Sequence, residues 1–356
     1  MKARVHEYVA NLHVHTTFSD GTGSLAEVIA AARETLDVLL INDHDTLAGR
    51  ENGYEGYHGR LLVLVGLELS GPHNHYLAFG LEECPDYAWR NPQGFIDSVR
   101  SKGGIGFIAH PFEKGSPLSE DGQAFTWTDW RVNGFDGLEI WNHSSTWKTK
   151  ARNRPTGLLH YYLNSWTLAG PDQETLDKWD ELGRTRRVAG VGGSDAHAFK
   201  GRAGPIKFCV FPYRHTFRSI NTHLLLPEPL GGDLARDRTM VLRALAAGSC
   251  FVAHDRLRRS EGFSFRLEKD GLGRAGPGQE VILEKGDALV WRLPARAWVR
   301  VLKNGRMIWQ DKAERGRVEV FSPGVYRLEA YWPLRFFGRR PWIYSNPIYL
   351  RASDGQ

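Results

Sequence analysis

Residues 37–46 read D-V-L-L-I-N-D-H-D-T, in which four consecutive apolar residues are followed at once by polar ones. An unbroken apolar run of this length is typical of a β-strand that is buried on both faces, as in a parallel sheet. His44 and its acidic neighbours come directly after this strand, where crowded polar side chains point to a function. Because the arrangement recurs along the chain, the segment predicts both the type of fold and the position of a functional site.

Strand and helix patterns alternate over the first part of the chain. Other buried strands are expected at 5–15, 61–67, 75–80, 104–110, 137–141 and 187–192. Helices are expected after the capping box of Ser24 and Glu27, at 92–102, and at 237–247 before Gly248. Repeated β/α units imply a parallel sheet, and so many units in one domain favour a barrel over an open sheet. We predict an α/β barrel domain at 1–258, with an aromatic insertion at about 112–180.

The pattern changes near Gly262. Short segments of alternating apolar and polar residues follow, separated by turn residues such as K-N-G at 303–305. Alternation with a period of two is typical of antiparallel strands that bury one face. We predict a small antiparallel β-sandwich at 259–356, which packs against the first domain and has a structural role.

The two predicted domains differ in charge. The net charge is +5, but residues from Arg256 onward contain 20 Lys and Arg against 11 Asp and Glu, a balance of +9, whereas the first 255 residues have a balance of −4. These basic residues alternate with acidic ones, so a solvated surface is favoured over a nucleic-acid site. The exception is R-F-F-G-R-R at 335–340, a basic and aromatic loop that could contact a partner.

Three observations favour a cytoplasmic protein without a membrane partner. Residues 1–13 contain no long apolar stretch, so a signal peptide is not expected. No run approaches the ~18 apolar residues of a membrane span. Cys84, Cys209 and Cys250 lie far apart in the sequence, as expected for buried thiols in a reducing compartment.

Nine side chains of the kind that bind metals close or follow the predicted strands. They are His13, His15, Asp20, His44, Glu68, His75, His110, Asp195 and His197. The C-terminal strand ends of a parallel barrel converge on one mouth, so these residues are expected to meet there. Imidazoles and carboxylates together suit a centre of two or three divalent ions, with Zn, Mn and Fe(II) as candidates.

Some of these assignments leave alternatives open. His13 and His15 are two positions apart at a strand end, so both imidazoles are expected on the same side. Asp20 could instead hold a turn. In H-N-H at 73–75, either His73 or His75 could be the ligand. We favour His75, because a strand pattern continues directly from it, whereas His73 lies in a segment rich in Gly and Pro.

Further residues are expected around the centre. Asp43 and Asp45 are interpreted as groups that orient imidazoles, and Glu139 as part of the outer site. His143 is a candidate substrate contact, since its strand should open on the same mouth. Arg202, just beyond the last ligand motif, is a candidate clamp for a phosphate group.

The chain resembles the PHP superfamily of polymerase and histidinol-phosphatase metallohydrolases over roughly residues 9–255. The matching motifs are H-V-H-T-T-F-S-D-G from His13, N-D-H-D-T from Asn42, G-L-E ending at Glu68, H-Y-L-A-F-G from His75, A-H-P at 109–111 and G-G-S-D-A-H at 192–197. The resemblance implies a distorted (β/α)7 barrel with a two- or three-metal site at its C-terminal face. It assigns one metal to His13, His15, Glu68 and Asp195, a second to Glu68, His75 and His110, and a third to Asp20, His44 and His197.

The chain departs from the superfamily pattern at two neighbours of the ligands. Asn11 stands where the first motif often begins with Asp, and Asn42 stands where Thr often precedes the Asp-His pair. Neither departure replaces a ligand. The aromatic segment 141–179 and P-W-I-Y-S-N-P-I-Y-L at 341–350 look similar to the carbaryl-hydrolase-like branch of the superfamily.

The predicted chemistry is metal-dependent hydrolysis of a small-molecule substrate. Adjacent divalent ions lower the pKa of a shared water, so a metal-bound hydroxide held by Glu68 and Asp195 is the expected nucleophile. Three ions exceed the charge of three carboxylates and one hydroxide by about +2, which favours an anionic substrate whose charge grows in the transition state. A phosphoesterase is therefore the leading hypothesis. Carbamate, amide or carboxyl-ester hydrolysis is the alternative, because the aromatic insertion could cover a neutral substrate, and a non-catalytic scaffold is the third.

Overall fold

The computed structural model describes residues 5–87, 90–118, 122–203 and 206–353. The strands up to residue 254 are β1 (His6–Asn11), β2 (Val38–Ile41), β3 (Gly56–His58), β4 (Leu61–Val65), β5 (Leu67–Ser70), β6 (His75–Phe79), β7 (Ile105–Ile108), β8 (Gly137–Asn142), β9 (Ala189–Gly193), β10 (Lys200–Ala203), β11 (Ile206–Cys209), β12 (Ile220–Leu226) and β13 (Cys250–His254). The later strands are β14 (Ser264–Lys269), β15 (Leu272–Ala275), β16 (Glu280–Ile282), β17 (Ala288–Lys303), β18 (Arg306–Glu319), β19 (Gly324–Leu334), β20 (Gly338–Ser345) and β21 (Ile348–Arg351). The helices are α1 (Leu25–Ala32), α2 (Ala48–Glu51), α3 (Pro92–Ser101), α4 (His143–Lys150), α5 (Arg154–Tyr162), α6 (Asn164–Thr167), α7 (Gln173–Thr185), α8 (Tyr213–Thr216) and α9 (Leu234–Ala247).

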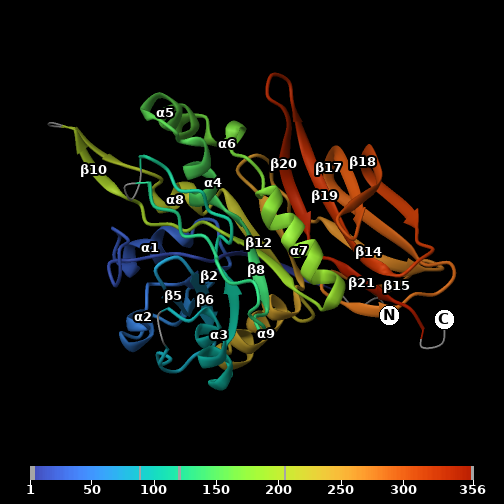
Figure 1. Ribbon diagram of the computed structural model, residues 1–356, viewed down its shortest axis with the longest axis horizontal. Helices are drawn as coiled ribbons and strands as arrows, with labels where there is room; N and C mark the ends of the chain where they lie inside the picture. Colours follow the sequence, from blue (N-terminus) through green and yellow to red (C-terminus); the bar gives the residue numbers. More distant parts are fainter. Residues whose placement is uncertain (1–4, 88–89, 119–121, 204–205, 354–356) are drawn as a thin grey trace.

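The fold is of the mixed α/β class, as predicted. Figure 1 shows the helices and shorter strands, coloured blue to yellow, beside a group of long strands coloured orange and red. Helices α3 and α9 lie at the bottom of this view, whereas α4, α5 and α6 lie at the top. Among the described residues, no helix is long and apolar enough to cross a membrane.

Hydrogen-bonded pairing combines parallel and antiparallel strands. β1, β2 and β4 are parallel neighbours, and so are β7, β8 and β9. However, β6 runs antiparallel to both β5 and β7, and β12 runs antiparallel to β1. The predicted succession of parallel β/α units is therefore wrong at β6, and the (β/α)7 barrel stays a prediction.

The two groups of parallel strands meet at the ends that carry polar residues. Isolated bridges join Val14 to Ala196 and His44 to Glu68, both in parallel orientation. A backbone hydrogen bond of 3.0 Å from the amide of His15 to the carbonyl oxygen of Ala196 reinforces the first of these bridges. The chain segments that follow β1, β2 and β9 therefore lie along one rim together with β5.

Local sequence explains the elements that lead to this rim. Every residue of β2 and of β4 is buried, in agreement with their unbroken apolar composition. The predicted capping box begins α1, because Ser24 Oγ accepts from the amide of Glu27 at 3.3 Å and the Glu27 carboxylate accepts from the amide of Ser24 at 2.8 Å. Gly248 ends α9 with a φ of 68°, a left-handed conformation that glycine adopts without strain.

The strands after β13 are mostly antiparallel, as their alternation predicts. β17 pairs with β14, β18 and β19 in this way, whereas β16 and β21 are parallel. β13 pairs with β12 on one side and with β20 on the other, so hydrogen bonding continues across the predicted boundary. The division into 1–258 and 259–356 and the β-sandwich stay predictions, and residues 1–4 and 354–356 of these ranges lie outside the described residues.

Buried polar contacts join the C-terminal strands to α7 and to β9. Arg327 on β19 is 1% exposed and donates to both carboxylate oxygens of Asp180 on α7, at 2.8 and 2.7 Å. The side chain of Asn346 donates to the carbonyl oxygen of Gly190 and accepts from its amide, both at 2.7 Å. The side chain of Asn346 thereby pairs with the backbone of β9 as a neighbouring strand would. The end of β9 leads into the rim.

Candidate metal centre

All nine predicted ligand-type side chains come together at this rim. Among the described residues, their nitrogen and oxygen atoms lie within 4.8 Å of one another in overlapping groups: His15, Asp20, His44 and His197; His13, His15 and Glu68; His13, His110 and Asp195; and His44, Glu68 and His75. Because these groups share members, the nine residues form one continuous cluster. Of the two alternatives at 73–75, His75 is buried and belongs to the cluster, whereas His73 is exposed.

Three residues of the cluster have a left-handed backbone. The φ angles are 68° at His13, 25° at His110 and 51° at Asp195. Such angles are strained for residues that carry a Cβ, and they are concentrated at functional sites.

His13 and His15 do bring their imidazoles to the same side, since their Nε2 atoms lie 3.1 and 3.2 Å from Oε2 of Glu68. The expected cause, the two-residue period of a strand, is wrong because β1 already ends at Asn11. The left-handed backbone at His13 replaces the strand at this point, and the ring centroids of His13 and His15 are 5.2 Å apart.

His75 reaches the rim because its strand is reversed. It is the first residue of β6 and pairs with Ser70, the last residue of β5. The start of an antiparallel strand lies beside the ends of its neighbours. The reversal of β6 therefore brings His75 next to Glu68, with 2.9 Å between Nδ1 of His75 and Oε1 of Glu68.

Glu68 lies at the centre of the cluster. Its Oε2 atom is 3.1 Å from Nε2 of His13 and 3.2 Å from Nε2 of His15, and its Oε1 atom is 3.4 Å from Nε2 of His110. The side chain is only 1% exposed. Burial alone would raise the pKa of this carboxyl, but the surrounding imidazoles outweigh burial and hold the pKa well below its ordinary value.

Asp195 and Asp20 also lie close to imidazoles of the cluster. The Oδ1 atom of Asp195 is 3.5 Å from Nε2 of His13 and 3.5 Å from Nε2 of His15. The Oδ2 atom of Asp20 is 3.1 Å from Nε2 of His197. The Asp195 side chain is 7% exposed, whereas that of Asp20 is 48% exposed, so Asp20 marks the side of the cluster that faces solvent.

The geometry at His15 fits cation binding better than hydrogen bonding. His15 is fully buried, yet neither of its ring nitrogens has a hydrogen-bond partner among the described residues. Its Nε2 atom is only 3.2 Å from Oε2 of Glu68, so the two atoms are close but not aligned for a hydrogen bond. Buried polar atoms are almost always paired, and a nitrogen and an oxygen that converge without pairing are suited to share a metal ion.

Burial and charge act in opposite directions on the imidazoles. Burial alone would lower the pKa of His13, but Glu68 and the other nearby carboxylates hold this pKa well above its ordinary value. The same competition raises the pKa values of His15 and His110 to about 9. At the more exposed His44, burial dominates and lowers the pKa to about 4. The centre of the cluster therefore stabilises positive charge, which a divalent cation would supply.

Groups outside the nine side chains contact the Nδ1 atoms of three imidazoles and thereby orient the rings. Nδ1 of His13 lies 3.1 Å from both carboxylate oxygens of Glu139, which is consistent with the outer role predicted for Glu139. Nδ1 of His44 is 2.6 Å from the hydroxyl of Ser70, and Nδ1 of His110 is 3.1 Å from the carbonyl oxygen of Phe125. Sequence reasoning missed the last two contacts, because neither residue type signals a role near an imidazole.

The interpretation of Asp43 and Asp45 is wrong, because the hydrogen bonds of both carboxylates go elsewhere. Asp43 accepts from the amide of Thr16 at 2.7 Å and from the hydroxyl of Ser19 at 2.6 Å, which holds the loop that carries Asp20. Asp45 accepts from the amide of Ser70 at 2.9 Å. These carboxylates stabilise backbone turns next to the cluster.

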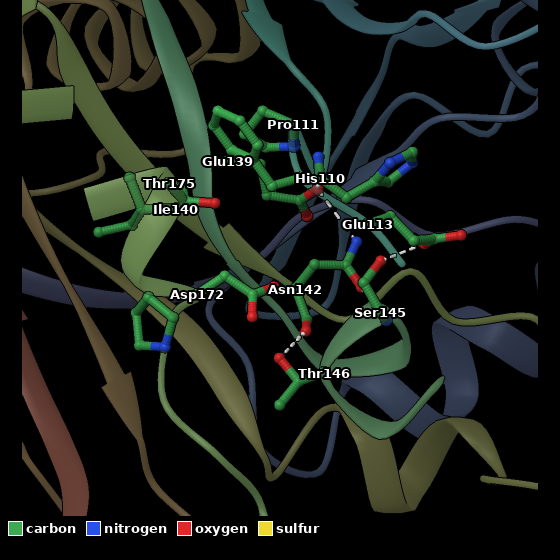
Figure 2. A pocket seen from close by; sticks show the side chains of 12 residues that line it. His110, Pro111, Glu113, Glu139, Ile140, Asn142, Ser145, Thr146, Asp172 and Thr175 are labelled. Carbon is green, nitrogen blue, oxygen red and sulfur yellow. Dashed lines mark hydrogen bonds between the residues drawn. The ribbon is translucent and has the colours of Figure 1, made fainter. Parts of the chain in front are cut away.

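A cleft adjoins the cluster on the side of His110 and Glu139. It offers only about 20 Å³, room for little more than a water molecule, and Glu113, Ser145 and Asn142 also line it. Figure 2 shows the amide of Asn142 directed at Glu139 and the hydroxyl of Ser145 directed at Glu113. Most of the polar groups in this cleft are thus paired with one another, and they support the cluster.

The two candidate substrate contacts lie outside the cluster. His143 is fully buried at the start of α4, and its Nε2 atom is 3.2 Å from Oδ1 of Asn164. Complete burial does not favour direct contact with a substrate. Arg202 is an exposed residue of β10, which pairs with β11. Its role as a phosphate clamp stays a prediction.

Comparisons with known proteins add little. No protein-family model and no curated protein sequence matches this chain. Among solved structures, the chain is similar to a two-domain protein from Bacteroides vulgatus ATCC 8482 that contains a predicted PHP-like metal-dependent phosphoesterase. The match covers 96% of this chain and 95% of that chain, with 15% sequence identity and a TM-score of 0.43. At this TM-score the likeness does not establish a common fold, and the description of that protein does not transfer to this chain.

Proposed function

We propose that this protein is a metal-dependent hydrolase whose active site is the cluster of nine side chains. The observation that carries the proposal is the convergence of six imidazoles and three carboxylates at one rim, with both buried ring nitrogens of His15 lacking a hydrogen-bond partner among the described residues. Side chains from segments far apart in the sequence supply these groups. Convergence of this kind is characteristic of a site that holds more than one cation.

The ligands are assigned in three sets that follow the resemblance to the PHP superfamily. The sets are His13, His15, Glu68 and Asp195; Glu68, His75 and His110; and Asp20, His44 and His197. These nitrogen and oxygen donors suit Zn, Mn or Fe(II). When bound, such ions activate a water molecule near neutral pH and stabilise negative charge on a substrate.

The substrate is proposed to approach from the side of Asp20. The side chains of Asp20 and His44 are 48% and 26% exposed, whereas that of Glu68 is 1% exposed. Phe199, which is 40% exposed, stacks on His197 with ring centroids 4.8 Å apart. The accessible side thus combines charged ligands with one apolar wall.

A phosphoester is the proposed substrate class. The imidazoles keep the pKa values of Glu68 and Asp195 well below the ordinary range despite burial, so both carboxylates stay ionised. With three divalent ions bound, three carboxylates and one hydroxide leave an excess of about +2 at the rim. An anionic group whose charge grows during the reaction gains most from this excess.

The test combines metal analysis with a panel of substrates. Protein reconstituted with Zn, Mn or Fe(II) is assayed against an aryl phosphomonoester, an aryl phosphodiester and an aryl carbamate. Cleavage of a phosphoester that a chelator abolishes and metal restores supports the proposal. Cleavage of the carbamate alone would overturn the phosphoesterase assignment, and metal-loaded protein inactive on every substrate would favour a scaffold.

We include three broader features in this proposal. They are a PHP-type (β/α)7 barrel at 1–258, a β-sandwich at 259–356 and a cytoplasmic location. The backbone contacts between the ends of β1 and β9 support the closure of a barrel at the rim. The resemblance of 141–179 and 341–350 to the carbaryl-hydrolase-like branch gains no support from the site and is not included.

A further inference from the structure

An exposed apolar stripe runs along α5 and α6. Leu158, Leu159, Tyr162 and Trp166 are 56%, 50%, 77% and 48% exposed, respectively. Leu158 and Tyr162 are four residues apart on α5, a spacing that places them on one face of this helix, and Trp166 follows on α6. Because an amphipathic helix normally buries its apolar face, this exposure indicates that a partner covers the stripe.

The hairpin formed by β19 and β20 extends the same surface. The ring of Trp166 lies 6.0 Å from that of Phe337, and Phe336 beside it is 83% exposed. Figure 1 shows α5, α6 and the tip of this hairpin at the top of the molecule. We define the apolar patch as Leu158, Leu159, Tyr162, Trp166 and Phe336.

The charged side chains of the two chain segments that carry the apolar patch all have one sign. Segments 143–168 and 331–342 contain no Asp or Glu. Their exposed cations are Lys150, Arg152, Arg154, Arg335 and Arg339. His160 on α5 is within electrostatic reach of both Lys150 and Arg340, so the two segments form one basic surface.

The partner has to match both the positive charge and the exposed apolar side chains of this surface. A symmetric contact with a second copy would place cations against cations, which repel each other. A nucleic acid would account for the cations and could stack its bases on the aromatic side chains, but it would leave the aliphatic Leu158 and Leu159 uncovered. An anionic lipid surface accounts for both, because aromatic and aliphatic side chains enter the headgroup region while Lys and Arg contact the headgroups.

We propose that the apolar patch and its surrounding cations dock this protein onto an anionic lipid surface. This departs from the expectation of no membrane partner, which rested on the lack of a spanning segment in the sequence. The proposal is independent of the hydrolase activity, because none of the nine cluster residues belongs to the patch.

Vesicle sedimentation tests the proposal with the full chain as purified. The probes are vesicles of phosphatidylcholine alone and vesicles with about 30% phosphatidylglycerol. One variant pairs Tyr162→Ser with Phe336→Ser, and another pairs Arg152→Glu with Arg335→Glu. The matched controls are Leu272→Ser, at a residue 69% exposed on β15, and Lys285→Glu, at an exposed cation in the C-terminal part. Thermal unfolding verifies that each variant remains folded.

The expected result is binding to the anionic vesicles at least about tenfold stronger than to the neutral ones, weakened by salt. Each paired patch variant is expected to lose at least about tenfold in binding, while both controls bind like the unaltered protein. Equal binding by the unaltered protein and both folded patch variants would overturn the proposal. So would tighter binding to a single-stranded oligonucleotide than to the vesicles, or a dimer that the patch variants abolish.

Discussion

At the scale of single residues, Glu68 joins the different parts of the cluster. One oxygen atom faces His13 and His15, and the other faces His75 and His110. A carboxylate in this position could supply one oxygen to each of two cations. An amide has no negative charge and could not replace it. Removal of its charge should therefore affect more than one metal position at once.

We expect Glu68→Gln to lower the metal content of the purified protein and to reduce hydrolysis by at least about 100-fold. Elemental analysis and initial rates measure the two effects. Glu268→Gln is the matched control, because Glu268 is also buried but lies on β14 and pairs with Arg266. Full metal content in the Glu68→Gln protein would contradict the assignment.

Glu139 is not one of the proposed metal ligands but contacts two of them. It fixes the ring of His13 and also accepts from the amide of His110 at 3.0 Å. We expect Glu139→Gln to weaken metal binding about 10- to 100-fold, because the charged partner that holds the imidazole is lost. Titration of metal-free protein with Zn measures the change. An unaltered affinity in a folded variant would show that Glu139 does not position His13.

At the scale of elements, the continuously apolar strands β2 and β4 were predictable, whereas β12 was not. β2 and β4 consist of apolar residues alone, so their burial follows from composition. β12 reads I-N-T-H-L-L-L and was missed, although its first five residues are buried. The polar side chains of β12 are buried because other strands supply partners, such as the carbonyl oxygen of Gly192 at 2.8 Å from Oγ1 of Thr222. No local pattern in the sequence reveals such partners.

A buried imidazole on β12 ties this strand to β1 and to the chain after β13. Nδ1 of His223 is 2.8 Å from Oε1 of Glu7, and Nε2 is 3.0 Å from Oδ2 of Asp255. Burial alone would lower the pKa of His223, but the two carboxylates outweigh it and raise the pKa to about 10. The protonated imidazole therefore stabilises the folded state.

This raised pKa predicts how stability depends on pH. Because the folded pKa exceeds the unfolded value of about 6.5, the contribution is present below about pH 6.5 and is lost as the pH rises through about 10. Its size at pH 6 is about 5 kcal/mol. Urea unfolding of the unaltered protein and His223→Gln should show a gap in unfolding free energy at pH 6 that narrows by pH 10. A gap independent of pH would contradict the charged state of His223.

At the scale of the whole molecule, the C-terminal strands and the part that carries the cluster share buried ionic contacts. Arg327 on β19 is enclosed by Asp180 on α7 and by Glu329, which accepts at 2.6 Å. A buried guanidinium that loses one partner is strongly destabilising, because its charge remains without full compensation. The contact between the two parts should therefore contribute to global stability.

We expect Asp180→Asn to lower the free energy of unfolding by about 3 to 5 kcal/mol. Denaturant unfolding measures the loss, and Asp177→Asn is the control on the exposed face of the same helix. The control should change stability by less than about 0.5 kcal/mol. A similar small effect for both variants would mean that the Arg327 contact does not stabilise the joined parts.

The sequence by itself determined the mixed α/β class, the apolar strands β2 and β4, the capping of α1 and the identity of the nine cluster residues. Tertiary structure alone decided the reversal of β6, the left-handed backbone at His13, His110 and Asp195, and the partners of Asp43 and Asp45. The physical reason is that hydrophobic periodicity and capping act between residues close in sequence. Strand direction, backbone strain and buried polar pairing depend on segments far apart in sequence that meet only in the folded molecule.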